Sequence, residues 1–237
     1  MLMTGTAQHR FRRAADKQDE EEAPVKTVVL GATGMAGSRI AAEAVRRGDE
    51  VVAVSRSGAA PVDSPLLTAV AADAGSVQEV AEVVRGADVV ASALAPARDG
   101  SDPRGPFAAL YDAVLDGVRA GSVRRVLIVG GAGSLQVDED TLLKDTPAVP
   151  DPVKPEAQAL TDVLAKLRTV DDLEWTYITP AADFAPGDRT GTFRIGGDAV
   201  LTDSEGNSHI SAEDYAIAFV DEMENAEHPN TRICVAY

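Results

Sequence analysis

Residues 26–40 read KTVVLGATGMAGSRI, and this stretch decides the fold. A β-prone run leads into Gly31, and Gly34 and Gly37 follow at three-residue spacing. Residues 38–47 then suit a helix. A strand that turns on glycines into a helix is the phosphate-binding unit of dinucleotide-binding folds, with the three glycines serving the tight turn, the close approach of a pyrophosphate and close helix packing. Free N–H groups at the helix start favour a bound phosphate. The alternative is an ordinary strand-to-helix turn in an α/β domain.

Predicted strands and helices alternate along most of the chain. The runs predicted as strands are 27–30, 50–55, 67–73, 88–94, 125–129, 175–179 and 232–235. The runs with helical periodicity are 38–47, 77–84, 107–120, 156–168 and 212–224, the last capped by Ser211. Such alternation is typical of a parallel sheet covered on both faces, and the apolar, β-branched strands fit burial on both sides. We therefore predict an α/β fold of the Rossmann type, with a doubly wound, mostly parallel sheet.

The second half of the chain has a different composition. Glycines punctuate residues 184–208, where two short strands, 192–195 and 199–202, are predicted to pair around a glycine turn. We predict a single NAD(P)-binding domain over residues 25–237, with a small substrate region at about 180–237. Residues 1–24 are polar, with a basic cluster followed by an acidic run, and are predicted to be a disordered extension.

Composition excludes several classes of function. The net charge of −16 over 237 residues argues against nucleic acid or an anionic membrane as partner. A single cysteine and three scattered histidines supply neither a disulfide framework nor a zinc site, so no metal is expected. No apolar run is long enough to span a bilayer and no secretory signal is recognised, so a cytoplasmic location is expected.

The end of the second predicted strand favours NADP over NAD. An acidic residue at that position holds the ribose 2′-hydroxyl of NAD, but this chain has Ser55, Arg56 and Ser57. A guanidinium pairs with a 2′-phosphate and stacks on adenine, and serine hydroxyls donate to it as well. The alternative for Arg56 is a solvated surface side chain. Asp73, after the third strand, is a candidate acceptor for the adenine amino group, or a turn or N-cap residue.

The ends of the predicted strands define one crevice, because ligands bind outside the carboxyl ends of parallel strands. Small residues after the fourth strand let a cofactor pass over the sheet edge, and the glycines after the fifth lie near the nicotinamide ribose. The residues predicted from these motifs to bind the cofactor are Gly31, Thr33, Gly34, Met35, Ala36, Gly37, Arg56, Ser57, Asp73, Ala93, Leu94, Gly130 and Gly131.

Four segments together resemble a known family. They are the GATGxxG turn, the Ser-Arg-Ser after the second strand, VLIVGGAGSL at 126–135, and WTYITPAADFAPGDRTG at 175–191. Over residues 26–237 the chain is similar to the atypical short-chain dehydrogenase/reductases, and within them to the NAD(P)H-binding group of flavin reductases, biliverdin reductase B-like enzymes and NmrA-like proteins. The last segment resembles bacterial proteins labelled NADH-flavin reductases. The resemblance implies a Rossmann core, a small C-terminal substrate region and Pro180-Ala181 beside the nicotinamide. Thr179, Pro180 and Ala181 are accordingly predicted to bind the cofactor.

One feature of typical short-chain dehydrogenases is absent. These enzymes use a Tyr-x-x-x-Lys pair, in which the lysine lowers the pKa of the tyrosine for proton transfer. Here the residues four positions after the tyrosines are Leu115, Ala181 and Phe219, and Tyr237 is the last residue given. Interconversion of alcohols and ketones by that route is therefore not expected. Lys154 is the candidate catalytic cation and Ser134 a candidate hydrogen-bonding residue; the alternatives are a solvated lysine and a turn-capping serine.

The predicted function is an NADPH-dependent reductase that transfers hydride to a small planar acceptor such as a flavin or a quinone. Such acceptors take hydride directly and are protonated from water, so the protein supplies alignment and excludes solvent. Phe184 and the glycines after it are a candidate lid, or alternatively part of the core. A second hypothesis is an NADP-binding sensor without turnover, as in NmrA-like proteins. A sugar epimerase is the third and least favoured, and the substrate and oligomeric state stay open.

Overall fold

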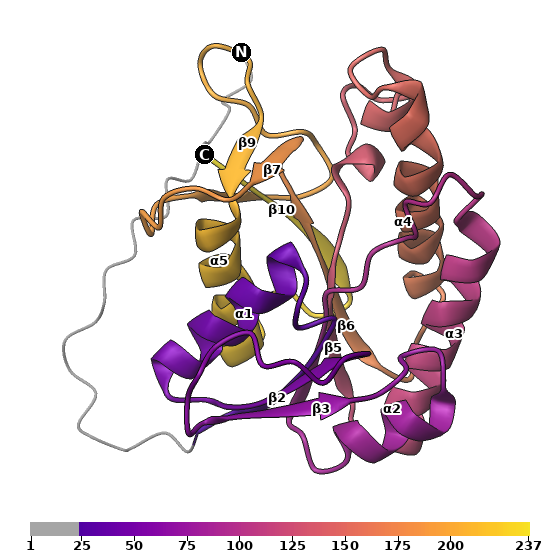
Figure 1. The fold of residues 1–237 in the computed structure, drawn as a ribbon. Coiled ribbons are helices and arrows are strands. Elements are labelled where there is room, and N and C mark those ends of the chain that lie inside the picture. Colours follow the sequence, from indigo (N-terminus) through magenta and orange to yellow (C-terminus); the bar gives the residue numbers. More distant parts are fainter. Residues whose placement is uncertain (1–23) are drawn as a thin grey trace.

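The computed structural model of the chain describes residues 24–237. Its main sheet has eight strands in the order β3-β2-β1-β4-β5-β6-β10-β8 (Figure 1). The strands of this sheet are β1 (Lys26–Leu30), β2 (Glu50–Ser55), β3 (Leu67–Ala71), β4 (Val89–Ser92), β5 (Arg125–Val129), β6 (Glu174–Pro180), β8 (Arg194–Gly196) and β10 (Thr231–Ala236). The α-helices of the described residues are α1 (Met35–Arg47), α2 (Val77–Val84), α3 (Arg104–Ala120), α4 (Lys154–Leu167) and α5 (Ala212–Asn225). Two short strands, β7 (Asp183–Ala185) and β9 (His209–Ser211), pair separately.

The strand order reverses at β1. From β1 the chain runs outward through β2 and β3, then returns to the other side of β1 as β4 and continues outward through β5 and β6. All pairs in the main sheet are parallel except the pair between β8 and β10 at one edge. The gap between the ends of β1 and β4 is therefore the switch point, where doubly wound sheets bind their ligands.

Helices cover both faces of the sheet (Figure 1). α1 and α5 pack on one face, and α2, α3 and α4 on the other. The alternation along β1 explains the two cores, because successive side chains of a strand point to opposite faces. Val29 lies in the core under α1 and α5, whereas Val28 and Leu30 lie in the core under the other helices. The predicted α/β, doubly wound class is confirmed.

Element boundaries follow the predictions closely where local signals are strong. The strands 50–55 and 125–129 and the helix 77–84 have the predicted bounds. Ser211 caps α5 as predicted, since its side chain accepts a hydrogen bond from the Asp214 amide.

The predicted hairpin of residues 192–195 and 199–202 is wrong. β8 pairs with β10 instead, and residues 199–202 form no strand. The amide of Val200 donates instead to the carbonyl of Gln136, at 2.9 Å. The open edge of a long strand thus competes successfully with a local glycine turn.

The predicted disordered extension, residues 1–24, lies outside the described residues except for Pro24. Within residues 24–237, no helix is both long and apolar enough to cross a bilayer.

Candidate functional site

The turn between β1 and α1 has the backbone that the glycine spacing predicts. Gly31 has a φ of +79°, and a Cβ there would stand 2.7 Å from the carbonyl oxygen of Ala93. A Cβ on Gly37 would overlap the Gly31 carbonyl. Gly34 differs, since a Cβ there would meet only the Gly31 carbonyl oxygen, at 3.3 Å. The space in front of Gly34 is open, so Gly31 and Gly37 serve the packing of the turn and Gly34 faces the crevice.

The start of α1 has unpaired hydrogen-bond donors. Gly34 is the N-cap and supplies no side-chain cap, and the first turn contains no acidic residue. The first helical hydrogen bond is from the Ser38 amide to the Gly34 carbonyl, at 2.9 Å. The amides of Met35, Ala36 and Gly37 consequently have no hydrogen-bond partner among residues 24–237. Free donors on a helix N-terminus suit a pyrophosphate.

The end of β2 adjoins this turn. The amides of Gly31 and Ala32 donate to the Val54 carbonyl at 3.0 and 3.1 Å, which ties the cradle to β2. Arg56 follows β2 directly, is exposed, and makes no ion pair or side-chain hydrogen bond within the described part of the chain. The hydroxyls of Ser55 and Ser57 lie 3.3 Å apart. An arginine with unused donors beside a phosphate cradle is chemically suited to a second phosphate.

Asp73 lies two residues beyond the end of β3 and forms a turn. Its Oδ1 accepts a hydrogen bond from the Gly75 amide at 2.9 Å, just before α2. Ala93 and Leu94 are half-buried at the end of β4, and the Ala93 amide donates to the Leu30 carbonyl at 2.8 Å. Ala93 and Leu94 therefore stand at the switch point, whereas Asp73 stands farther out along the same edge.

Gly130 and Gly131 are required by packing. A Cβ on Gly130 would enter the ring of Tyr177, and a Cβ on Gly131 would lie 2.6 Å from Leu160 Cδ1. The Gly130 amide donates to the Ile178 carbonyl at 2.7 Å, which places this loop beside the end of β6. Packing against Tyr177 and Leu160 therefore explains why both positions are glycine, without reference to a cofactor.

The end of β6 is enclosed. Thr179, Pro180 and Ala181 are all buried, and Thr179 Oγ1 has no hydrogen-bond partner among residues 24–237. Ala182 and Asp183, which follow, are exposed. The structure thus brings the ends of β5 and β6 together and leaves only their rim accessible.

Ser134 is buried and its hydroxyl is engaged. It donates to the Gly131 carbonyl at 3.0 Å and accepts from Arg232 Nη1 at 3.3 Å. Arg232 is itself buried and forms an ion pair with Asp198. Sequence analysis missed Arg232, although a charged residue inside the apolar strand TRICVA was a usable signal. These contacts fit the turn-capping alternative for Ser134 better than a substrate contact.

Lys154 is the first residue of α4 and is partly exposed. Its Nζ lies 2.7 Å from Asp151 Oδ1, an ion pair on the surface. Lys154 also borders a cavity of about 520 Å³ between the starts of α3 and α4. Because helices that follow parallel strands begin at the carboxyl edge of the sheet, this cavity opens on the same edge as the cradle.

The tyrosines are unsuited to proton transfer. Tyr111, Tyr177 and Tyr215 are fully buried, and burial raises the pKa of each hydroxyl well above its ordinary value. Their hydroxyls contact Ser92 Oγ, the Leu160 carbonyl and the Ile178 carbonyl respectively. The absence of a Tyr-x-x-x-Lys pair is therefore matched by the absence of any accessible tyrosine at these three positions.

Buried acids hold the segment that follows β7. Asp214 is fully buried and accepts hydrogen bonds from the amides of Thr190 and Gly191, each at 2.8 Å. It also accepts from the hydroxyl of Tyr237 at 2.8 Å and from the Thr190 hydroxyl. No local sequence pattern indicates this role, because the partners of Asp214 lie more than twenty residues away in the chain.

Glu43 links the same segment to α1. It accepts from Arg46 at 2.6 Å, from Arg47 at 2.9 Å and from Arg189 at 3.0 Å. Burial alone would raise the pKa of Glu43, but these hydrogen bonds outweigh it and lower the pKa from 4.5 to about 2. The two acids together fasten residues 189–191 to the helix that begins at the cradle and to α5.

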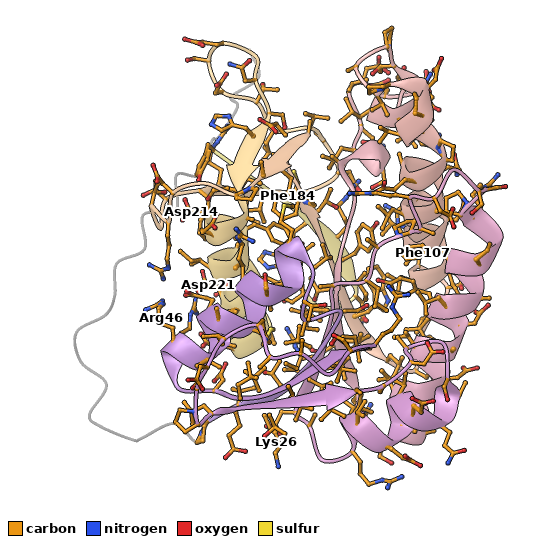
Figure 2. The ribbon with its side chains drawn as sticks, viewed as in Figure 1. Lys26, Arg46, Phe107, Phe184, Asp214 and Asp221 are labelled. Carbon is orange, nitrogen blue, oxygen red and sulfur yellow. The ribbon has the colours of Figure 1, made fainter. Side chains whose placement is uncertain are left out.

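Phe184 is half-buried and its ring centroid lies 4.8 Å from that of Tyr215. Figure 2 shows Phe184 and Asp214 on the side of the molecule that carries α1 and α5, with Phe107 on the side of α3. The packing against Tyr215 supports the core alternative for one face of Phe184.

Comparisons with known proteins agree with this geometry. A family model described as NAD(P)H-binding matches residues 31–227. A solved structure from Burkholderia pseudomallei, named a "putative exported protein", is 46% identical, with a TM-score of 0.80 and coverage of 90% of this chain and 100% of that one. One from Bacteroides thetaiotaomicron, named a "putative epimerase", is 40% identical, with a TM-score of 0.82 and coverage of 90% and 97%. One from Streptococcus pneumoniae TIGR4, named a "putative NADH-flavin reductase", is 35% identical, with a TM-score of 0.73 and coverage of 90% and 99%.

Proposed function

Because the chain belongs to the NAD(P)H-binding family, we propose that it is an NADPH-dependent reductase of a small planar acceptor such as a flavin or a quinone. The observation that carries this proposal is the N-terminus of α1, which has no side-chain cap and three amides without partners among residues 24–237. Open space lies in front of Gly34, and Arg56, which follows β2, has no side-chain partner within the same residues. NADPH, when bound, supplies the hydride; the protein supplies its position and surroundings.

The cradle residues have separate tasks. The amides of Met35, Ala36 and Gly37 bind the pyrophosphate at the N-terminus of α1. Thr33 and Gly34 form the exposed rim of the turn. These five residues define a dinucleotide site without distinguishing the two cofactors.

The preference for NADPH rests on the end of β2. Arg56 pairs with the 2′-phosphate, and the Ser57 hydroxyl donates to it. Asp73 accepts from the adenine amino group through Oδ2, since Oδ1 is engaged by Gly75. None of these contacts favours NADH.

Toward the acceptor, we propose that the chain stabilises negative charge with a lysine and that no tyrosine donates a proton. Lys154 Nζ, which pairs with the exposed carboxylate of Asp151, stabilises negative charge that develops on an acceptor after it gains two electrons with the hydride. Water then supplies the proton. An acceptor that needs a strong acid in the transition state, such as a ketone, is a poor substrate because the three tyrosines within the core are inaccessible.

A second candidate is an NADP-binding sensor without turnover. The buried tyrosines and the engaged hydroxyl of Ser134 favour it. Few groups are then available for catalysis, whereas the phosphate-binding cradle is complete. A sugar epimerase remains the least favoured, since it needs the same missing acid, although one related structure carries that name.

The test is oxidation of NADPH with flavins and quinones added singly. We expect turnover with at least one planar acceptor and none with simple alcohols or ketones. Lys154→Ala should lower the single-turnover rate more than cofactor affinity. Lys166→Ala is the matched control, because both lysines are on α4, ion-paired and of similar side-chain exposure, 41% and 37%. Tight NADPH binding with no turnover on any acceptor would favour the sensor.

We also propose a single domain over residues 25–237, a cytoplasmic location, and no nucleic-acid or membrane partner. The continuous sheet supports the single domain, and the charge of −16 argues against a nucleic acid or an anionic membrane as partner. A related structure named as exported makes the location the one to test first, by fractionating cells that express the chain.

A further inference from the structure

A cavity of about 520 Å³ lies between the loop before α3, the turn Leu143–Asp145 and the start of α4. This volume falls within the range of small-molecule sites. Its wall carries three cations and three carboxylates, namely Arg104, Lys144, Lys154, Asp102, Asp145 and Asp151. In a chain of net charge −16, a cavity with balanced formal charge is a local departure from the acidic average.

The carboxylates of this wall are already engaged. Asp102 accepts from the Arg104 amide at 3.0 Å, and Asp145 accepts from Lys144 through both oxygens, at 2.7 and 2.8 Å. Asp151 accepts from Lys154 at 2.7 Å. Asp145 and Asp151 are also more exposed than the lysines that they pair with, so they lie toward solvent.

The cations retain unused donors. Arg104 binds Asp162 through Nε at 2.9 Å, and its Nη groups have no partner among residues 24–237. The Lys144 side chain is only 13% exposed, and Asp145 accepts from at most two of its three N–H donors. Gln158 donates to Asp162 at 2.7 Å and also borders the cavity. An arginine carries five N–H donors and a lysine three, so the wall offers more donors than its own carboxylates use.

The N-termini of α3 and α4, which lie beside the cavity, add positive electrostatic potential to it. Pro103 and Val153, the N-caps of α3 and α4, make no side-chain cap hydrogen bonds. The positive ends of both helix dipoles therefore point toward the region of the cavity. A helix dipole alone does not select a ligand. Its positive end nevertheless favours an anion, as do the unused N–H donors of Arg104 and Lys144.

We propose that this cavity binds an anionic arm of the acceptor, a phosphate or a carboxylate, through Arg104 and Lys144. The proposal rests on the proposed function, because it names the class of acceptor that the reductase takes: a planar ring with an acidic side chain. Lys154, the cation proposed to stabilise charge on the acceptor, borders the same cavity. Arg104 and Lys144 bind the acceptor in this proposal, and neither takes part in hydride transfer.

The experiment compares ligands that differ only in the acidic group. Flavin mononucleotide and riboflavin share one ring and differ by a phosphate, and a naphthoquinone with and without a propionate side chain differs by a carboxylate. Affinities are measured by fluorescence quenching or calorimetry without NADPH, for the wild-type chain, Arg104→Met and Lys144→Met. Arg119→Met is the matched control, because Arg119 is an ion-paired arginine at the other end of α3.

We expect the wild-type chain to bind at least one anionic member more tightly than its neutral counterpart. Each variant should reduce that ratio about tenfold, as expected for a lost hydrogen bond to a charged group, and Arg119→Met should keep it. Arg104 is about half exposed, so its variant is expected to fold. Which pair shows the preference identifies the acidic group.

Equal affinities within both pairs would overturn the proposal, and so would a preference that survives both substitutions. These results are separable from the test of the reductase. Turnover of NADPH with neutral acceptors alone would leave the reductase standing and remove the anionic arm. Preferential binding of flavin mononucleotide over riboflavin without any turnover would support the anion-binding cavity and contradict the reductase.

Discussion

The cradle at the start of α1 and the segment 187–191 after β7 are built in opposite ways. The cradle leaves its donors unpaired, since the amides of Met35, Ala36 and Gly37 have no partner among residues 24–237. In the segment 187–191, the amides of Gly187, Thr190 and Gly191 donate to the carboxylates of Glu213 and Asp214 on α5. A region that leaves donors free is suited to bind an external anion, whereas one whose donors are satisfied internally is suited to hold a fixed shape.

The two regions also share a support. α1 carries the cradle at its start and Glu43 in its middle, and Glu43 pairs with Arg189. Glu213 of α5 bonds both the Gly187 amide, at 2.7 Å, and Arg39 of α1, at 2.6 Å. Variants in each region should therefore show how far cofactor binding at the cradle is independent of the stability that the segment 187–191 provides.

The largest expected effect is from Gly34→Val. A side chain there enters the open space that the pyrophosphate needs, so NADPH affinity should fall more than a hundredfold, or about 3 kcal/mol. The fold should persist, because only one atom lies within 4 Å of the new Cβ. NADPH titration and circular dichroism measure the two effects. Gly197→Val is the control, since a Cβ there meets nothing within 4 Å and Gly197 follows β8 at the far edge of the sheet from β3. Retained affinity in a folded Gly34 variant would contradict the cradle.

Asp214→Asn tests the other region. The amide keeps the shape but loses one acceptor and places a donor against the Thr190 and Tyr237 hydroxyls. The free energy of unfolding should fall by about 2–3 kcal/mol, as for a buried charged group that loses hydrogen bonds. Urea denaturation gives this value, and NADPH affinity should change little. A large loss of affinity would show that the two regions are coupled through α5 and α1.

Arg56→Glu sharpens the cradle assignment. Loss of a charge-assisted pair should weaken NADPH binding by about 1.5–3 kcal/mol, with NADH affinity unchanged or improved. Fluorescence titration of both cofactors against both proteins gives the difference. Arg85→Glu is a matched control, because Arg85 is also exposed and lies outside the cradle at the end of α2. If NADPH binds both proteins equally, Arg56 is a solvated surface residue.

The smallest expected effect comes from Glu43. Its pKa is about 2 in the folded chain against 4.5 in the reference state, so its stabilising contribution is complete above about pH 4.5 and is lost as the pH falls toward 2. The shift corresponds to at most about 3 kcal/mol, and partial exposure of Arg46 and Arg189 reduces this to about 1–2 kcal/mol. Denaturation across this pH range should show a shallower decline for Glu43→Gln. Parallel curves for the two proteins would assign the acid sensitivity elsewhere.

Much of the fold could be predicted because it depends on local signals. The strand-turn-helix at 26–47 is specified by glycine spacing and apolar runs, and the bounds of β2, β5 and α2 follow from periodicity. β7 and β9 were missed because each has three residues, too few for a period to show. β8 was assigned the wrong partner because strand pairing is set by the edge of β10, which lies about forty residues away in the chain.

The candidate site divides in the same way. Gly31, Gly34 and Gly37 were predictable from spacing, since their roles depend on the adjoining strand and helix. Gly130 and Gly131 were predicted as cofactor contacts, yet their packing against Tyr177 and Leu160 becomes visible only in three dimensions. The roles of Asp214 and Arg232 depend on partners brought together by the fold, so no local pattern could reveal them.

The most direct test of the central claim is single-turnover oxidation of NADPH carrying deuterium at C4, with flavin mononucleotide or a quinone as acceptor. If the protein aligns the cofactor for direct hydride transfer, one of the two C4 stereoisomers should react several-fold more slowly than unlabelled NADPH. The Gly34→Val protein should show no reaction at the same cofactor concentration. Absence of oxidation with every acceptor, or oxidation with no isotope effect from either stereoisomer, would contradict the account.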